Sequence, residues 1–257
     1  MPFAALGLKP ALVRAARDAG LAEPTPIQAD AIPAILAGRD LLATAPTGSG
    51  KTAAFALPLL HSLISPALRR TQALVLVPTR ELATQVGDTL RTMAQHLPDT
   101  AKIAVLFGGV SINPQMMGLR GGADVVVATP GRLLDLVEHN ALRLDQVALL
   151  VLDEADRLLD AGFADELARV LALLPARRQN LMFSATFPAA VQGLADVLLR
   201  DPQRIEVPTD AELLPAITQR SIQVDAPRRT QLLRHLIQSE GWARVLVFVA
   251  TQYATEH

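Results

Sequence analysis

The chain has 257 residues, of which 50% are hydrophobic and 19% are charged, so it is long enough to bury a sizeable core. It contains no cysteine, which excludes disulfide scaffolds and thiolate metal sites, and its five histidines show no metal-ligand spacing. With a formal net charge of −1, any polyanion would be held by a local basic surface and not by a general positive field.

The N-terminal segment does not look like a targeting signal. It carries Lys9, Arg14 and Arg17 where a signal peptide needs an uninterrupted apolar stretch. No apolar run in the chain approaches the roughly 20 residues of a membrane helix. We therefore expect a cytoplasmic protein, and a monomer.

Six short apolar runs rich in Val, Leu and Ile alternate with stretches of helical period such as Leu133 to Asn140 and Ala164 to Leu174. Because the runs are apolar on both faces, they predict an α/β fold with a mostly parallel sheet and helices on both sides. The predicted strands are Asp40 to Thr44, Ala73 to Val77, Ile103 to Phe107, Asp124 to Ala128, Val147 to Leu152 and Asn180 to Phe183. Ligands of such sheets gather at the carboxyl ends of the strands.

A phosphate-binding loop is predicted after the first strand. The segment Ala45-Pro46-Thr47-Gly48-Ser49-Gly50-Lys51-Thr52 follows a strand and opens a helix, which is the context of a P-loop, although Ala stands where the pattern begins with Gly. Backbone amides would surround the phosphates, Lys51 would hold the β and γ phosphates, and the Thr52 hydroxyl would bind Mg²⁺. A glycine-rich turn with a chance lysine is the alternative.

Acidic residues follow the fifth predicted strand as Asp153-Glu154-Ala155-Asp156. Carboxylates leaving an apolar strand are costly unless they meet a cation, which favours Asp153 as a contact of Mg²⁺ and Glu154 as the group that orients or deprotonates the attacking water. An acidic helix start is the alternative. A phosphate loop and a carboxylate pair at strand ends together predict nucleotide hydrolysis.

With these motifs the chain resembles the first RecA-like domain of a DEAD-box ATP-dependent RNA helicase, whose name is spelled by residues 153–156. The phrases at 3–8 and 158–163 resemble the bacterial RhlE-type group most. The resemblance implies a helicase N-terminal domain over residues 1–207 with ATP and Mg²⁺ as cofactors, a linker over 208–216, and the incomplete start of a second RecA-like domain over 217–257.

The resemblance extends to a Q motif at Gly20 to Gln28. It implies that the Gln28 amide reads the adenine edge, that Thr25 belongs to the nucleotide site, and that an aromatic residue 17 positions before the motif, Phe3, stacks on the base. The alternative is a Pro-Thr helix cap with Gln28 on a solvated face.

Three further segments resemble motifs that bind the RNA backbone. They are Pro78-Thr79-Arg80-Glu81-Leu82-Ala83, Gly108-Gly109 and Thr129-Pro130-Gly131-Arg132. Each offers backbone amides, hydroxyls or a guanidinium at a helix start, and none reads a base edge, so sequence-independent binding is predicted. Surface salt bridges are the alternative for the two arginines.

Ser184-Ala185-Thr186 resembles the motif that couples the nucleotide to the RNA, with Asp156 as the expected hydrogen-bond acceptor. A simple Ser/Thr turn is the alternative. Beyond the proline-bounded linker, a strand at Ile217 to Val224, an amphipathic helix around Gln231 to Gln238 and a strand at Val245 to Val249 are predicted.

The resemblance places arginine fingers in the part of the second domain that this sequence lacks, and such a finger is worth about 10³ to 10⁵ in rate. Three functions therefore stay open. The first is an ATP-dependent RNA helicase, represented by its N-terminal portion. The second is a non-catalytic module that binds ATP and RNA, and the third is a related translocase acting on DNA, because phosphate contacts alone do not separate RNA from DNA.

Overall fold

The computed structural model describes residues 2–64, 70–99, 101–160, 162–208 and 218–251. The chain divides into two compact units, Met1–Thr209 and Asp210–His257, and each is described by itself. Most of the predicted linker over 208–216 lies outside the described residues.

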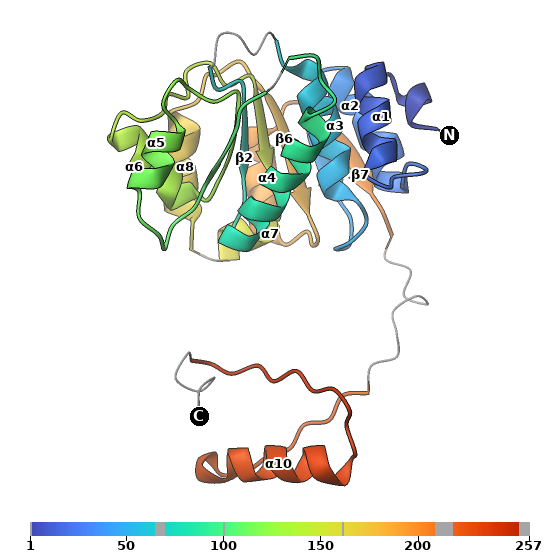
Figure 1. Ribbon diagram of the computed structural model, residues 1–257, viewed down its shortest axis with the longest axis vertical. Helices are drawn as coiled ribbons and strands as arrows, with labels where there is room; N and C mark the ends of the chain where they lie inside the picture. The colour runs from blue at the N-terminus through green and yellow to red at the C-terminus, as the bar shows by residue number, and fades with distance from the viewer. Residues whose placement is uncertain (1, 65–69, 100, 161, 209–217, 252–257) are drawn as a thin grey trace. The chain divides into compact units, whose positions relative to one another are not determined.

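The first unit is built on a seven-stranded sheet in the order β3-β4-β2-β5-β6-β1-β7 (Figure 1). Every neighbouring pair is parallel. The strands are β1 (Leu41–Thr44), β2 (Ala73–Leu76), β3 (Ile103–Leu106), β4 (Val125–Ala128), β5 (Leu149–Leu152), β6 (Gln179–Ser184) and β7 (Gln203–Glu206). All six predicted strands are present, and the predicted α/β class is confirmed.

Helices cover both faces of this sheet. They are η1 (Phe3–Leu6), α1 (Pro10–Asp18), α2 (Pro26–Leu36), α3 (Lys51–Ser62), α4 (Arg80–Ala94), α5 (Asn113–Gly118), α6 (Pro130–Glu138), α7 (Ala155–Asp160), α8 (Ala164–Ala172) and α9 (Ala189–Leu198). The helices η1 and α1 to α4 share one hydrophobic cluster with residues such as Ala43 and Val75, and α6 to α9 share a second with Leu42 and Leu74. Neighbouring strand residues thus bury their side chains on opposite faces, as period-two alternation requires.

The strand β7 was not predicted from the sequence. It pairs only with β1 and forms an edge of the sheet. Of its four residues only Ile205 is buried, so the segment lacks the continuous apolar run that identified the other strands. An edge strand with one buried side chain gives too weak a pattern to distinguish it from a loop.

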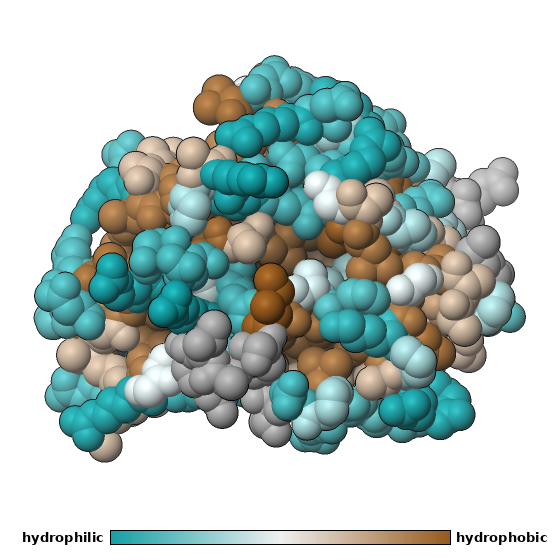
Figure 2. Space-filling view, turned by 90° about the horizontal axis from the view of Figure 1, so that it is seen from above, coloured by the Kyte–Doolittle hydropathy of each residue, from teal (hydrophilic) through white to brown (hydrophobic). Residues whose placement is uncertain are grey.

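The carboxyl ends of all seven strands lie at one edge of the sheet because the strands are parallel. The chain leaves β7 at the lower side of this unit in Figure 1, so that side is the carboxyl edge. Figure 2 views the opposite side, where hydrophobic patches alternate with hydrophilic ones and do not merge into one apolar area. Within the described residues, no helix is long and apolar enough to span a membrane.

The second unit contains η4 (Ala226–Arg228) and α10 (Arg229–Ser239), so the predicted amphipathic helix is present. The two predicted strands are wrong for the residues that the structure describes: 218–224 and 245–249 have extended or irregular backbone without ladder partners. An apolar run becomes a strand only where a neighbouring strand accepts its hydrogen bonds, and the described part of this unit offers none.

Candidate functional site

The loops at the carboxyl edge form two groups, because the order of strands in the sheet differs from their order in the chain. Residues 45–52, 153–156 and 184–186 follow β1, β5 and β6, which lie side by side. Residues 78–80, 108–109 and 129–132 follow β2, β3 and β4, which lie side by side in the other part of the sheet. We call these groups the β1 side and the β3 side.

The loop after β1 turns through two glycines in left-handed conformation, Gly48 with a φ of 84° and Gly50 with a φ of 93°. Gly50 is the N-cap of α3, and a Cβ atom there would lie 2.3 Å from the Gln28 Nε2 atom. Both the backbone conformation and the close approach therefore require glycine at position 50.

Lys51 opens α3 and is largely buried. Its ammonium Nζ donates a 2.7 Å hydrogen bond to the Ala45 carbonyl at the other end of the same loop. The Ser49 Oγ is buried and has no hydrogen-bond partner among the described residues. The loop thus holds a cation and a free hydroxyl group beside the N-terminus of a helix, which is the environment that favours an anion.

Thr25 and Gln28, at the start of α2, form hydrogen bonds to the backbone of this loop. The Thr25 Oγ1 donates to the Ser49 carbonyl at 2.8 Å, and the Gln28 Nε2 donates to the Gly50 carbonyl at 3.1 Å. The Gln28 Oε1 accepts from the Thr25 amide at 3.1 Å, which makes the two residues a capping box. The cap weighed as an alternative is therefore present, but Gln28 lies on no solvated face, since its side chain is fully buried.

A cavity of about 610 Å³ opens between α1, α2, α3 and α4. Gln28, Gly50 and Thr52 line it, so it adjoins the loop after β1. Phe3 does not line it: the ring is 4% exposed and packs in the core cluster on η1. Stacking of Phe3 on a base remains a prediction. In the loop after β1, Pro46 is half-buried and Thr47 is exposed.

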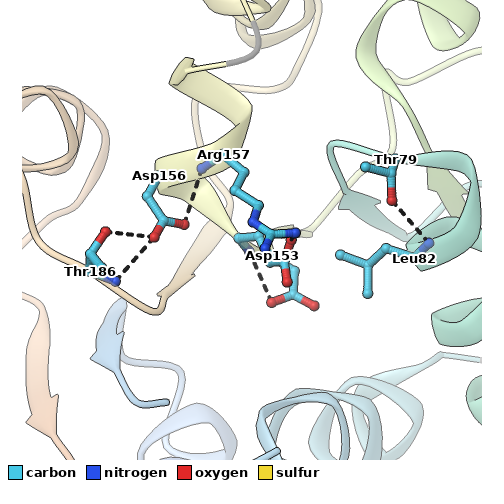
Figure 3. Close-up of polar contacts among 7 residues, drawn as sticks. Thr79, Leu82, Asp153, Asp156, Arg157 and Thr186 are labelled. Atoms are coloured by element: carbon cyan, nitrogen blue, oxygen red, sulfur yellow. Dashed lines mark hydrogen bonds and ion pairs between the residues drawn. The ribbon is translucent and has the colours of Figure 1, made fainter. Parts of the chain in front are cut away.

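Asp153 is 3% exposed at the end of β5, and its Oδ1 accepts a 3.0 Å hydrogen bond from the Glu154 amide (Figure 3). Burial raises the pKa of Asp153 to about 6, and the nearby charge of Lys51 works in the opposite direction. Glu154 adopts a left-handed φ of 52°, and its carboxylate forms a 3.2 Å ion pair with Arg157. A strained backbone of this kind is common at functional sites.

Asp156 faces β6, and Figure 3 shows its carboxylate pointing to a different side from that of Asp153. The Asp156 Oδ2 accepts from the Thr186 amide at 3.1 Å and from the Thr186 Oγ1 at 2.7 Å, while the Ser184 Oγ donates to the Thr186 carbonyl at 2.7 Å. Burial would raise the pKa of Asp156, but hydrogen bonds, above all those from Thr186, hold it below its ordinary value. The predicted hydrogen bond to Asp156 is present, and coupling through it remains a prediction.

The described residues contain no group of three or more metal-binding side chains. Mg²⁺ does not need one, because it keeps several waters and takes one or two carboxylates together with substrate phosphates. Thr52 and Asp153 are the two side chains predicted to meet it. The environment of Asp153 fits a cation, since burial penalises its charged form unless a positive charge lies beside it.

On the β3 side, Thr79 and Arg80 are exposed at the start of α4, while Pro78 is buried behind them. The Thr79 side chain caps α4 by accepting from the Leu82 amide at 3.2 Å (Figure 3). The Arg80 guanidinium lies 5.2 Å from the centre of the Phe107 ring. Within the described residues Arg80 forms no ion pair, so the surface salt bridge weighed for it is not found.

Three glycines on the β3 side have open space around them. A Cβ atom at Gly108, Gly109 or Gly131 would meet no atom within 4 Å. Gly109 needs its left-handed φ of 78°, but Gly108 and Gly131 have no positive φ. Nothing inside the protein therefore requires glycine at positions 108 and 131, which is typical of backbone that a ligand approaches closely.

The segment 129–132 begins α6, with Thr129 as N-cap and Pro130 at the first position. Thr129, Pro130 and Arg132 are buried. The Arg132 Nη2 donates to the Val110 carbonyl at 2.6 Å, and the Nε lies 3.6 Å from an Asp135 carboxylate oxygen. The salt bridge weighed for Arg132 is thus present, and its contact with RNA remains a prediction.

Sequence reasoning missed the residues that hold the loops of the β3 side in place. Phe107 lies under Arg80, and the Gln115 side chain bonds to the backbone of Phe107. Neither residue belongs to a recognised motif, and a glutamine near the start of a short helix gives no signal in the sequence. The role of the two residues is visible only in the structure, where the Gln115 side chain on α5 bonds to the backbone at the end of β3.

Residues 25–194 match the family described as DEAD/DEAH box helicase. The chain is 41% identical over 253 residues to the ATP-dependent RNA helicase DeaD of Escherichia coli strain K12, covering 98% of this chain and 40% of that protein. It is 45% identical over 246 residues to the ATP-dependent RNA helicase DbpA of the same strain, covering 95% of this chain and 53% of that protein.

A solved structure of a DEAD box protein from the hyperthermophile Methanococcus jannaschii has a TM-score of 0.76 and 35% identity, covering 100% of this chain and 68% of that one. The chain spans about half of each curated relative or less, at 40% of DeaD and 53% of DbpA. The resemblance to the RhlE-type group remains a prediction.

Proposed function

Because the chain belongs to the DEAD/DEAH box helicase family, we propose that it is the ATP-binding part of an ATP-dependent RNA helicase. In this proposal it binds ATP with Mg²⁺ and the backbone of single-stranded RNA, and the intact protein uses ATP hydrolysis to separate short RNA duplexes. The observation that carries the proposal is the placement of both predicted sites on neighbouring strand ends of one sheet edge.

The β1 side fits a nucleotide triphosphate. Left-handed glycines turn the loop at the N-terminus of α3, and within the described residues the Lys51 ammonium bonds only to a backbone carbonyl. The buried Ser49 hydroxyl lacks a partner among the described residues. We propose that phosphate oxygens take the place of the Ala45 carbonyl at Lys51 and bind the free hydroxyl, because charge-assisted hydrogen bonds are stronger than neutral ones.

Thr52 and Asp153 would hold Mg²⁺, which supplies charge neutralisation at the β and γ phosphate oxygens when it is bound. Glu154 follows Asp153 in a strained turn that sets the direction of its carboxylate. We assign to Glu154 the orientation or deprotonation of the attacking water. Its ion pair with Arg157 has to loosen for this role, because that contact uses one carboxylate oxygen.

The β3 side fits the backbone of a nucleic acid strand. Thr79, Arg80 and the two glycines after β3 are exposed, and the open glycine positions let a phosphate approach main-chain amides closely. Contacts of this kind read no base, so binding would be independent of sequence. Asp156, held by the amide and hydroxyl of Thr186, would couple the two sides.

Hydrolysis by this chain alone is expected to be weak. The family resemblance places the arginines that complete the ATP site in the second RecA-like domain, beyond the part present here. An arginine finger is worth about 10³ to 10⁵ in rate. Nucleotide binding, in contrast, requires only the β1 side. We further propose a cytoplasmic location and a monomeric state.

The experiment measures ATP hydrolysis by the 257-residue chain and by a version extended to the length of the relatives, each without nucleic acid and with single-stranded RNA. We expect RNA to stimulate the extended protein strongly and the chain hardly at all. Single-stranded DNA of the same sequence should stimulate less. Equal stimulation by DNA would favour the translocase alternative, and no stimulation of the extended protein by any RNA would refute the helicase proposal.

A further inference from the structure

The segment that follows β3 leaves the sheet at a free edge. β3 is the first strand in the sheet order and pairs only with β4. Residues 107–110 therefore have no neighbouring strand on one flank, and 108–110 are exposed. A loop of this kind, rich in glycine, is ordered only if side chains from elsewhere hold its backbone.

Gln115, on α5, forms hydrogen bonds to the backbone of this segment. The Phe107 amide donates to the Gln115 Oε1 at 3.2 Å, and the Gln115 Nε2 donates to the Phe107 carbonyl at 3.0 Å. One carboxamide thus satisfies both backbone groups of Phe107 on the side that lacks a strand. It continues the hydrogen-bonding pattern of the sheet by one residue.

Two arginines hold the same segment from the neighbouring loops. The Arg132 Nη2 donates to the Val110 carbonyl at 2.6 Å, from a side chain that is 7% exposed. The Arg80 guanidinium lies over the Phe107 ring on the other flank. The segment is therefore tied to α4, to α5 and to α6, and through Arg80 and Arg132 to both other loops of the β3 side.

We propose that Phe107, Gln115 and Arg132 form a clamp that fixes residues 107–110 in the conformation that binds the RNA backbone. Gln115 and Arg132 are positioning residues that hold the backbone of the segment, and Phe107 is the residue of the segment through which Gln115 and Arg80 act. The positioning role of Arg132 rests on the bond from its Nη2 to the Val110 carbonyl, while its buried Nε and Nη1 have no hydrogen-bond partner among the described residues. The inference rests on the proposed RNA binding of the β3 side.

The physical advantage of the clamp is preorganisation. Ordering several backbone residues at the moment of binding costs conformational entropy that is subtracted from the affinity. A clamp that orders the segment beforehand removes this cost. Breaking it should weaken RNA binding even though no group that touches RNA is lost.

The chain contains a matched control for this test. The Gln72 side chain makes the same pair of bonds to the backbone of Ile64, accepting from its amide at 2.8 Å and donating to its carbonyl at 2.8 Å. Gln72 directly precedes β2 and so lies at the opposite edge of the sheet from the predicted RNA site. Gln115→Leu and Gln72→Leu therefore remove equivalent bonds at different distances from that site.

The experiment titrates the 257-residue chain and both variants with a fluorescent single-stranded RNA at low and moderate salt, and measures ATP affinity and Tm for each. Gln115→Leu should weaken RNA binding about tenfold, which is the order expected for two hydrogen bonds. The slope of affinity against salt should not change, because no charge is removed. Gln72→Leu should leave RNA affinity within about twofold, and ATP affinity should stay unchanged in both.

Phe107→Leu and Phe107→Tyr provide a second test that does not depend on Gln115. The leucine variant lacks the aromatic ring under Arg80 and should bind RNA more weakly. The tyrosine variant keeps the ring and should bind RNA as tightly as the unchanged chain. Hydrogen exchange of the amides at 108–110 should accelerate in Gln115→Leu and Phe107→Leu only.

The outcomes separate the clamp from the proposed function. If the unchanged chain binds RNA and Gln115→Leu binds equally well, the clamp is refuted while RNA binding stands. If both glutamine variants lose affinity in proportion to their Tm, the effect is one of general stability and the clamp is refuted as well. If the unchanged chain does not bind RNA at low salt, the proposed function fails and the inference fails with it.

Discussion

The two sides of the carboxyl edge are built in opposite ways. On the β1 side, Lys51, Gln28 and Asp153 are buried and bonded to backbone groups of the loops on that side. On the β3 side, Arg80 and the glycines at 108 and 109 are exposed, and the buried Arg132 side chain bonds to the backbone of the segment after β3. One side has its binding groups occupied by internal partners, and the other presents open backbone.

The difference fits the two kinds of ligand that we propose. The phosphate oxygens of a small nucleotide can replace internal carbonyl oxygens as hydrogen-bond partners one at a time. Binding groups that already have internal partners therefore do not prevent nucleotide binding. A long strand has to meet several loops at once, which favours loops fixed in advance. The following predictions test this comparison, from the largest expected effect to the smallest.

Lys51→Ala should reduce ATP affinity at least about 100-fold, because a charged hydrogen-bond donor at the phosphates is lost. A fluorescent ATP analogue measures this by titration. Lys102→Ala is the control, since the Lys102 Nζ also donates to a backbone carbonyl, that of Arg120, at 2.8 Å, but Lys102 directly precedes β3 and so lies at the opposite edge of the sheet. If Lys51→Ala binds ATP with unchanged affinity, the β1 side is not the nucleotide site.

Asp153→Asn should stabilise the protein in the absence of Mg²⁺ and nucleotide. With a pKa raised to about 6 from 3.8, the folded state keeps a proton that the unfolded state releases, so stability falls as pH rises from about 4 to about 6. The amide does not titrate, so the variant should gain on the order of 2–3 kcal/mol at pH 7. Urea unfolding in EDTA at pH 4.5 and 7 measures it, and a variant less stable at pH 7 would contradict it.

Arg80→Ala should weaken RNA binding about tenfold and lower the slope of log affinity against log salt by about 0.7, which is the value for one phosphate contact of a single strand. Fluorescence anisotropy over a series of salt concentrations provides both quantities. Arg91→Ala is a suitable control, because Arg91 lies near the far end of the same helix and pairs with Asp88 at 2.9 Å. A slope unchanged by Arg80→Ala would assign this side chain to packing on Phe107 alone.

Gly108→Ala should leave the Tm within about a degree, since a Cβ atom there meets open space and φ is not positive. The added methyl should nevertheless weaken RNA binding several-fold by keeping the phosphate from the backbone amide. Gly38→Ala, at a left-handed φ of 76° and far from the carboxyl edge, should show the reverse pattern, with lower Tm and unchanged binding. If Gly108→Ala binds RNA as tightly as the unchanged chain, the RNA backbone does not approach Gly108.

The sequence predicted the parts of the fold that depend on continuous apolar burial. All six predicted runs became strands, and four of them, β1, β2, β4 and β5, are almost entirely buried, which gives the continuous apolar pattern. The edge strand β7 was missed because only Ile205 is buried there. The two runs predicted as strands after residue 216 did not pair, because pairing depends on partners that a local pattern cannot supply.

The candidate site was predictable as a set of motifs but not as a set of contacts. Glycine and lysine spacing located the loop after β1, yet nothing in the sequence indicates that the Gln28 amide bonds to Gly50 or that Phe3 is buried in the core. Arg132 belongs to a motif, but its burial appears only when α6 packs beside the segment after β3. Tertiary packing determines the direction in which a side chain points, and the spacing of residues in the sequence does not reveal that direction.

The ladder between β2 and β5 joins the two sides, and the four residues of each strand are fully paired and buried. No folded fragment of this unit can therefore keep one side and lose the other. A nucleotide that binds only the folded state suppresses global opening everywhere at once. Amide protons of β3 and β4 that exchange only through global unfolding should then be protected by ATP, although they belong to the side that nucleotide does not touch.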